Sequence, residues 1–244
     1  NGQSNGAVSM GITSGHGPYT FSWSSGDTTQ NISAKPAGSY SVTVSDAYGC
    51  VAIDSAIVSE PAALTGSVTG ITDATCYGLN NGGINITAAG GTGLLHYSWS
   101  NTNTTQNLVN VYAGPYHVTV KDGNNCSITL NGTVNQPTQI VTSATSTDIV
   151  CAHGTTGSIA LNVSGGTGTY TYLWNTGDTT QNISNQAAGS YTVTVTDASS
   201  CSVVLLASIS QTNPVTISET HSNIHCNGGG DGSIAVTTTG GTGI

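Results

Sequence analysis

The sequence predicts an all-β protein made of tandem immunoglobulin-like (PKD-like) antiparallel β-sandwich domains of about 75 residues each, in a linear string. Three observations predict this fold class. Short stretches alternate apolar residues with serine and threonine, turn signals recur every ~8–12 residues, and one motif returns at a near-constant spacing. No window shows the periodicity of an amphipathic helix.

The recurring motif is clearest at residues 188–201, which read AGSYTVTVTDASSC. Tyr191, Val193 and Val195 point to one face of an extended chain, and the threonines between them point to the other. This alternation is typical of a half-buried antiparallel strand. Related copies, each ending in an aspartate and a cysteine, occur at 37–50 and 113–126.

The cysteines set the period of the repeat. The leading cysteines Cys76, Cys151 and Cys226 are 75 residues apart, and a trailing cysteine follows 50 residues after each of the first two. Counting back from Trp23 in the same register places a leading cysteine immediately before Asn1. We therefore expect the sequence to be part of a longer array of repeats.

Domain boundaries are expected at prolines, because proline interrupts a β-ladder and stiffens a connection. A partial Ig-like repeat without its first strand and leading cysteine is expected at 1–60. Complete Ig-like repeats are expected at 61–136 and 137–213, and the N-terminal part of another at 214–244.

The repeat at 137–213 shows the expected order of elements. A segment after Pro137 leads to the first cysteine and a Gly/Asn turn. An alternating strand, a glycine-rich hairpin turn and an aromatic strand follow at 159–163, 165–168 and 170–174. A short strand around Ile183, the tyrosine strand and a last strand bring the number to about seven, as in an immunoglobulin-like sandwich.

Six aromatic residues occupy two recurring positions and are expected in the cores. The tryptophans alternate inward with other aromatic residues, which favours core packing over a sugar-stacking platform. Each tyrosine opens a strand after a glycine turn, where the hydroxyl of a tyrosine corner bonds to nearby backbone. The predicted core residues are Trp23, Trp99, Trp174, Tyr40, Tyr116 and Tyr191.

The cysteines allow pairing within a repeat or across a boundary between neighbouring repeats. We expect both cysteines of a repeat at the same pole of its sandwich, and a Cα separation of ~5.5 Å disfavours a bond across the boundary. The predicted disulfides are Cys76–Cys126 and Cys151–Cys201, with Cys50 and Cys226 paired outside this sequence. Zinc is disfavoured because neither CxxC nor CxxH spacing occurs, and disulfides indicate an oxidising compartment.

The charge composition excludes several classes of partner. The chain has two lysines, no arginine and a net charge of −9, so it lacks the basic cluster that nucleic acid or an anionic membrane surface requires. No stretch approaches the ~20 apolar residues of a membrane span, so we expect no direct membrane insertion in this segment.

Asp46, Asp122 and Asp197 recur at one position and have two interpretations. An aspartate that caps a hairpin turn is favoured. The alternative is a calcium ligand near a domain junction, although calcium needs six to eight oxygens and no carboxylate cluster is visible. No other cofactor or metal is expected.

No catalytic constellation recurs among the repeats. Ser4 lies in a G-x-S-x-G pattern, but in the turn before an antiparallel strand and without an equivalent serine elsewhere. His221 and His225 are four residues apart on a predicted strand, about 13 Å, which is too far to share an ion. We therefore expect no enzyme activity in this segment.

The composite motif resembles the SprB repeat. It runs Cys…Gly…GGTG-x-Tyr-x-Tyr-x-Trp…Gly-Asp-Thr-Thr-Gln-Asn-Ile…Ala-Gly-Ser-Tyr-x-Val-Thr-Val-x-Asp…Cys and is clearest from Cys151 to Cys201. The resemblance covers the whole chain. The second repeat departs from it at Leu94-Leu95-His96, Asn103 and Pro115, which affects surface detail and not the fold.

The resemblance implies a stalk segment of a large, non-catalytic cell-surface filamentous adhesin of Bacteroidetes, used in gliding motility and surface attachment. It implies an extracellular, outer-membrane-attached filament exported by type IX secretion. The implied partners are the secretion and gliding machinery, with a substratum or polysaccharide at the filament tip. The alternative function is a spacer or glycan-binding repeat of a secreted multidomain enzyme.

Three short stretches are also similar to the O-glycosylation sequon of that phylum. They are Asp27-Thr28-Thr29, Asp54-Ser55-Ala56 and Asp178-Thr179-Thr180, with Thr28, Ser55 and Thr179 as the acceptors. Ordinary turn residues explain these stretches equally well.

Overall fold

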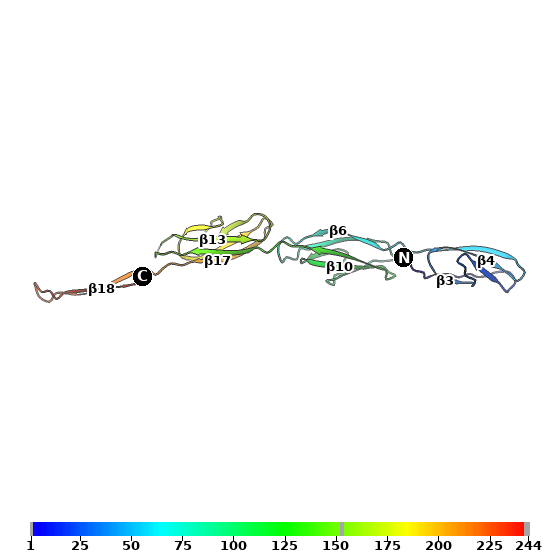
Figure 1. Cartoon of the computed structure of the whole chain (residues 1–244), viewed down its shortest axis with the longest axis horizontal. Helices are drawn as coiled ribbons and strands as arrows, with labels where there is room; N and C mark the ends of the chain where they lie inside the picture. Colours follow the sequence, from blue (N-terminus) through cyan, green and yellow to red (C-terminus); the bar gives the residue numbers. More distant parts are fainter. Residues whose placement is uncertain (1, 152–153, 242–244) are drawn as a thin grey trace. The chain divides into compact units, whose positions relative to one another are not determined.

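The computed structural model describes residues 2–151 and 154–241. Within these ranges every regular element is a β-strand, and Figure 1 draws only strands and connecting loops. The chain forms two compact units. The first contains Asn1–Thr72, Gly83–Val109 and Gly114–Val134, and the second contains Asp73–Gly82, Asn110–Ala113 and Asn135–Ile244.

The second unit contains a six-stranded sandwich. One antiparallel sheet has the order β12-β13-β15, and the other has the order β14-β16-β17. The strands are β12 (Val141–Thr147), β13 (Gly157–Ser164), β14 (Thr171–Trp174), β15 (Ile183–Gln186), β16 (Gly189–Thr196) and β17 (Ser202–Ile209).

This topology is immunoglobulin-like. In chain order, one sheet takes the first, second and fourth strands and the other takes the third, fifth and sixth. That division matches the A-B-E and C-F-G strands of an immunoglobulin sandwich. The predicted all-β, Ig-like fold class is confirmed. Among the described residues no strand occupies the D position, so the repeat has six strands where the sequence suggested about seven.

The core of this sandwich lies between its two sheets. Trp174 is 2% exposed, and Val193 and Val195 on β16 are fully buried, as their alternation predicted. Burial of such side chains is the main driving force for the fold. The buried cluster is Ile149, Ile159, Leu161, Trp174, Ile183, Tyr191, Val193, Val195 and Ile209.

Two tyrosines form the predicted tyrosine corner. The Tyr191 hydroxyl donates to the Ala187 carbonyl at 2.7 Å, and the Tyr40 hydroxyl donates to the Pro36 carbonyl at 2.8 Å. In both cases the acceptor lies four residues upstream, so the hydroxyl fixes the turn that starts the strand.

The first unit repeats this topology in full once and in part once. One sheet is β6-β7-β9 and its partner is β8-β10-β11. These strands are β6 (Thr65–Thr72), β7 (Gly82–Ala89), β8 (His96–Trp99), β9 (Leu108–Val111), β10 (Gly114–Lys121) and β11 (Ser127–Val134). In the N-terminal part, β1 (Gly6–Val8) pairs with β3 (Ile32–Lys35). A second sheet has the order β2-β4-β5, with strands β2 (Thr20–Trp23), β4 (Gly38–Ser45) and β5 (Val51–Val58).

A two-stranded hairpin of β18 (Thr216–Ser222) and β19 (Ser233–Thr239) completes the described strands. It belongs to the second unit and corresponds in sequence to the first two strands of a repeat. The boundaries expected at residues 60, 136 and 213 stay a prediction.

The Thr-Thr-Gln-Asn stretch extends a β-ladder through side chains. The Gln181 amide donates to the Leu161 carbonyl at 2.6 Å, and the Leu161 N–H donates to the Asn182 side-chain oxygen at 2.9 Å. The same pair of bonds joins Gln30 and Asn31 to Met10, and Gln106 and Asn107 to Ile86. The backbone N–H and C=O of Leu161, Ile86 and Met10 therefore have hydrogen-bond partners at positions that β15, β9 and β3 do not reach.

Candidate functional site: the cysteine joint

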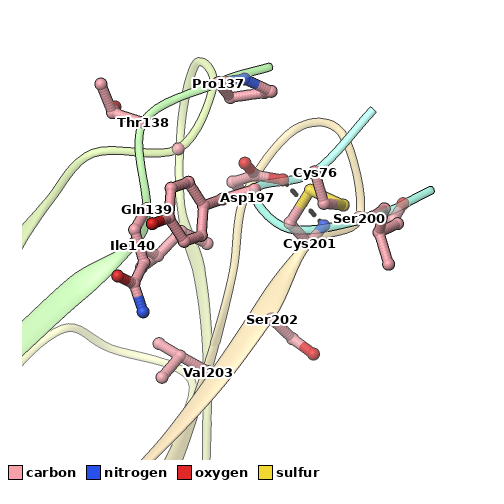
Figure 2. Close-up of a pocket in the computed structure, with 13 residues that line it drawn as sticks. Cys76, Pro137, Thr138, Gln139, Ile140, Asp197, Ser200, Cys201, Ser202 and Val203 are labelled. Atoms are coloured by element: carbon pink, nitrogen blue, oxygen red, sulfur yellow. Dashed lines mark hydrogen bonds between the residues drawn. A yellow bond between two sulfur atoms is a disulfide. The ribbon is translucent and has the colours of Figure 1, made fainter. Parts of the chain in front are cut away.

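A disulfide between Cys76 and Cys201 defines the site. The two cysteines are 125 residues apart in sequence, and their Cα atoms are 5.7 Å apart. This separation is normal for a disulfide. Cys76 lies in the loop Asp73–Gly82, which belongs to the second unit together with Cys201. Figure 2 shows the bond beside Asp197.

The Asp197 carboxylate shapes the loop that presents Cys201. One carboxylate oxygen accepts the N–H groups of Ser199 and Cys201, both at 2.9 Å, and the other accepts the N–H of Thr167 at 2.8 Å. Asp197 is only 5% exposed. The prediction of a turn-capping aspartate is correct for this residue.

The glycine turn at 165–168 links this loop to the segment after Pro137. The Gly166 N–H donates to the Thr138 carbonyl, and the Ala198 N–H donates to the Thr167 carbonyl. Gly165 and Gly166 have positive φ values of 79° and 66°. A Cβ atom on Gly165 would lie 1.9 Å from the Gln139 carbonyl oxygen, so only glycine fits there.

The loop that carries Cys76 has its own anchors. The Gly78 N–H donates to the Gln136 side-chain oxygen at 2.8 Å, and the Thr75 N–H donates to the Asn81 side-chain oxygen at 3.1 Å. The Ala74 N–H donates to the Asn135 carbonyl at 2.9 Å. Both cysteines are therefore held by loops with defined hydrogen bonds.

Two opposing effects set the pKa of the loop aspartates. Burial raises the pKa of Asp197, but the N–H groups of Cys201, Thr167 and Ser199 outweigh it and leave the pKa below its ordinary value. Asp122 has a lowered pKa for the same reasons, with Cys126, Thr92 and Asn124 as donors. The pKa of Asp46 is lowered chiefly by the N–H of Cys50. These carboxylates are ionised at neutral pH.

A pocket lies against the disulfide. Its lining includes Tyr77, Leu79 and the segment from Pro137 to Ile140. The one carboxylate in the lining is Asp197, and both of its oxygens accept backbone hydrogen bonds. The arrangement joins two loops covalently and presents no acid–base pair.

The predicted pairings Cys76–Cys126 and Cys151–Cys201 are wrong, because Cys76 and Cys201 bond to each other. The first strand of a repeat runs parallel to its last strand, as the parallel bridge between Ile149 and Gln211 shows. Cys151 therefore lies near the end of β17, whereas Cys201 precedes its start.

Eight residues of β17 span about 26 Å at ~3.3 Å per residue, far more than a disulfide can bridge. In the second repeat, Asn135 at the end of β11 donates to Asp73, just before Cys76, and Cys126 precedes the start of β11. Among the described residues Cys50, Cys126, Cys151 and Cys226 are free and exposed.

The predicted core aromatics occupy the expected places with one difference. Five are buried, and Tyr116 is half-buried. Each tryptophan ring N–H donates to a backbone carbonyl six residues later. The acceptors are Thr29, Thr105 and Thr180, at 2.8, 2.8 and 2.9 Å. The tryptophans thus hold the following turn against the core.

The calcium alternative stays a prediction. In the described part of the chain no group of three or more His, Cys, Asp or Glu side chains is placed to hold a metal ion. Three other carboxylates accept backbone hydrogen bonds: Glu60 from Gly2, Asp73 from Asn135 and Asp148 from Ser210. His225 contacts Asp231 at 2.8 Å, and His221 lies 3.7 Å from Glu219.

The candidate O-glycosylation residues are all exposed. Thr28 and Thr179 lie in the turn after the tryptophan, and Ser55 lies on β5. The neighbouring Asp27 forms an ion pair with Lys35 at 2.5 Å, and Asp178 accepts the Thr176 hydroxyl at 2.6 Å. Their modification stays a prediction.

Sequence reasoning missed two functional parts of the repeat. The Gln and Asn side chains that extend the ladder were recognised only as part of the composite repeat motif. The GGTG turn was interpreted only as a hairpin turn, although it also contacts the aspartate loop. The constant spacing of 30 residues between Thr167 and Asp197, and between Thr92 and Asp122, was the available signal.

No helix among the described residues has the length and apolar character needed to cross a membrane.

The comparison with solved structures finds tandem immunoglobulin-domain proteins. The N-terminal eight Ig domains of DSCAM match at 11% identity and a TM-score of 0.38, over 89% of this chain and 35% of that one. Sidekick-1 immunoglobulin domains 1–5 match at 12% identity and a TM-score of 0.30, over 79% of this chain and 52% of that one. Domains 4–9 of the surface layer protein SbsC match at 15% identity and a TM-score of 0.22, over 81% of this chain and 40% of that one. These TM-scores lie below 0.5, and the fold assignment rests on strand topology instead.

No curated protein matches this sequence. The SprB repeat model matches four segments, residues 1–28, 68–104, 143–179 and 218–244, which together make up more than half of the chain. Each segment contains the strand after the leading turn and reaches at least the glycine turn. The chain therefore belongs to the SprB repeat family.

Proposed function

We propose that this chain is a repetitive, non-catalytic stalk segment of a large extracellular filamentous adhesin, used for surface attachment and gliding motility. The observation that carries the proposal is the disulfide between Cys76 and Cys201. It links the leading cysteine of one SprB repeat to the trailing cysteine of the next. A bond across consecutive repeats suits a molecule that transmits force along its length.

Three further features support a mechanical role. Each described sandwich has a dense apolar core closed by a tryptophan whose ring N–H is satisfied. The pocket beside the disulfide has no unengaged carboxylate. The chain contains only two Lys or Arg residues, so trypsin-like proteases find almost no sites on an exposed stalk.

The proposed setting is the cell surface. A structural disulfide forms and persists in an oxidising environment, which favours an exported protein. By membership of the SprB repeat family, we propose export by type IX secretion, attachment at the outer membrane and movement by the gliding machinery. A substratum or polysaccharide is the proposed ligand, bound at the filament tip.

The test is made in the bacterium that carries the gene. Intact cells are labelled with an antibody to this segment and treated with proteinase K, because trypsin has only Lys121 to cut, since Lys35 is followed by Pro36. We expect surface labelling that proteinase K removes. Deletion of the gene is expected to reduce attachment to glass and spreading on agar.

Two results would contradict the proposal. Protease-resistant signal in intact cells excludes a surface stalk, and unchanged attachment and spreading after deletion exclude an adhesive role. A glycan array with the purified chain distinguishes the alternative. Specific sugar binding by the repeats themselves would favour a glycan-binding module, and no binding leaves recognition to another part of the protein.

A further inference from the structure

The first unit contains a second pocket built like the one beside the disulfide. The pocket in the second unit is lined by Leu79, the segment after Pro137, Asp197 and Cys201. The pocket in the first unit is lined by the equivalent positions, namely Gln3, the segment after Pro61, Asp122 and Cys126. The difference is that Cys126 is a free, exposed thiol.

The loop that presents Cys126 has the same hydrogen bonds as the loop that presents Cys201. One oxygen of Asp122 accepts the N–H of Cys126 at 2.8 Å and of Asn124 at 3.0 Å, and the other accepts the N–H of Thr92 at 2.9 Å. The Gly91 N–H donates to the segment after Pro61, as Gly166 does after Pro137. Equivalent hydrogen bonds therefore hold the loops of Cys126 and Cys201.

The opposite side of this pocket is also preformed. The Gly2 N–H donates to the Glu60 carboxylate at 2.7 Å, just as the Gly78 N–H donates to Gln136 at 2.8 Å. Cys76 lies two residues before Gly78. The equivalent position, two residues before Gly2, is the one immediately before Asn1.

We propose that Cys126 is a disulfide site for a cysteine placed immediately before Asn1. The general rule is that the leading cysteine of each repeat bonds to the trailing cysteine of the following repeat. Cys76–Cys201 is one case of this rule, and the pocket around Cys126 is prepared for another. The proposal concerns covalent connectivity and does not depend on the proposed adhesive function.

The bond forms by thiol–disulfide exchange with a small-molecule disulfide such as oxidised glutathione. One thiolate attacks a glutathione sulfur and releases reduced glutathione. The second protein thiolate then attacks the mixed disulfide and releases another. Two protein thiols lose two protons and two electrons, and one glutathione disulfide is reduced to two glutathione thiols.

The test adds one cysteine before Asn1 of the full chain and refolds the protein with oxidised and reduced glutathione. Free thiols are then blocked, and the denatured protein is cut with endoproteinase Asp-N, which cleaves before each aspartate and places the N-terminus, Cys50 and Cys126 in separate peptides. The added cysteine is the only one in the N-terminal peptide. We expect most of this peptide to be disulfide-linked to the peptide that starts at Asp122.

Matched variants identify the partner. Cys126→Ser is expected to abolish the link, Cys151→Ser is expected to leave it intact, and an added serine is expected to give none. The Cys76–Cys201 bond, mapped in the same sample, reports correct folding. With that bond present, an added cysteine that stays free, joins Cys50, or forms only dimers between chains would overturn the proposal.

Discussion

A single buried carboxylate organises the cysteine loop of each repeat at the residue scale. Asp197 binds three N–H groups from two segments that are 30 residues apart. Its lowered pKa means that folding favours the ionised form. The stabilisation is complete above the ordinary Asp pKa of about 3.9 and is lost as the pH falls through the lower folded value.

We expect Asp197→Asn to lower the urea midpoint at pH 7 and to reduce the loss of stability between pH 5 and pH 3. An asparagine keeps one acceptor oxygen but loses the charge. Unfolding followed by tryptophan fluorescence at both pH values measures this. Asp178→Asn is the control, because its carboxylate accepts one hydroxyl in an exposed turn. Identical pH profiles for Asp197→Asn and the unsubstituted chain would contradict this role.

One residue departs from the repeat at a strained backbone position. Thr102 has a φ of 70°, whereas glycine occupies the equivalent turn position at Gly26 and Gly177. We expect Thr102→Gly to raise the free energy of unfolding by roughly 0.5–1 kcal/mol, because a β-branched residue is strained in this region. The reverse change, Gly177→Thr, is expected to lower it. Equal thermal midpoints for all three proteins would show that the position is not strained.

At the scale of elements, the side chains of Gln181 and Asn182 continue the hydrogen bonding of β13 beyond the end of the short strand β15. The Leu161 N–H is buried and has the Asn182 side chain as its acceptor. We expect Asn182→Ala to cost about 1–2 kcal/mol, since the N–H loses its partner. Denaturant unfolding measures the change. Ser184→Ala on β15 is the control, and a cost no larger than that of the control would contradict the role.

The sequence predicted strand faces well and chain direction poorly. The alternation of Tyr191, Val193 and Val195 was sufficient to predict β16 and its buried face, because a strand has a period of two. The disulfide could not be predicted in this way. Whether Cys151 and Cys201 share a pole depends on the direction of the first strand relative to the last, and the side-chain pattern carries no information about direction.

The candidate site was predicted only in its components. Cysteines, turn acids and glycine turns were all identified at their positions. Their association depends on contacts between segments from consecutive repeats, such as Pro137–Ile140 with Cys76 and Cys201. Periodicity within one repeat does not describe such contacts.

At the scale of the whole molecule, the Cys76–Cys201 bond closes a segment of 125 residues. In the chain-entropy model such a loop contributes roughly 5 kcal/mol by restricting the unfolded chain. We expect the double variant Cys76→Ser/Cys201→Ser to have a clearly lower thermal midpoint. The variant Cys126→Ser/Cys151→Ser is the control, because these thiols are free in this chain. Equal loss of stability in both variants would contradict a specific role for the bond.

Single-molecule stretching of the chain between handles at its two ends tests the central claim most directly. Residues between Cys76 and Cys201 cannot extend while the bond is intact, and 125 residues extend to about 440 Å at ~3.5 Å each. The oxidised chain is therefore expected to have a final contour length about 440 Å shorter than the Cys76→Ser variant or the reduced chain. Equal contour lengths in the three samples would show that consecutive repeats are not covalently linked in this way.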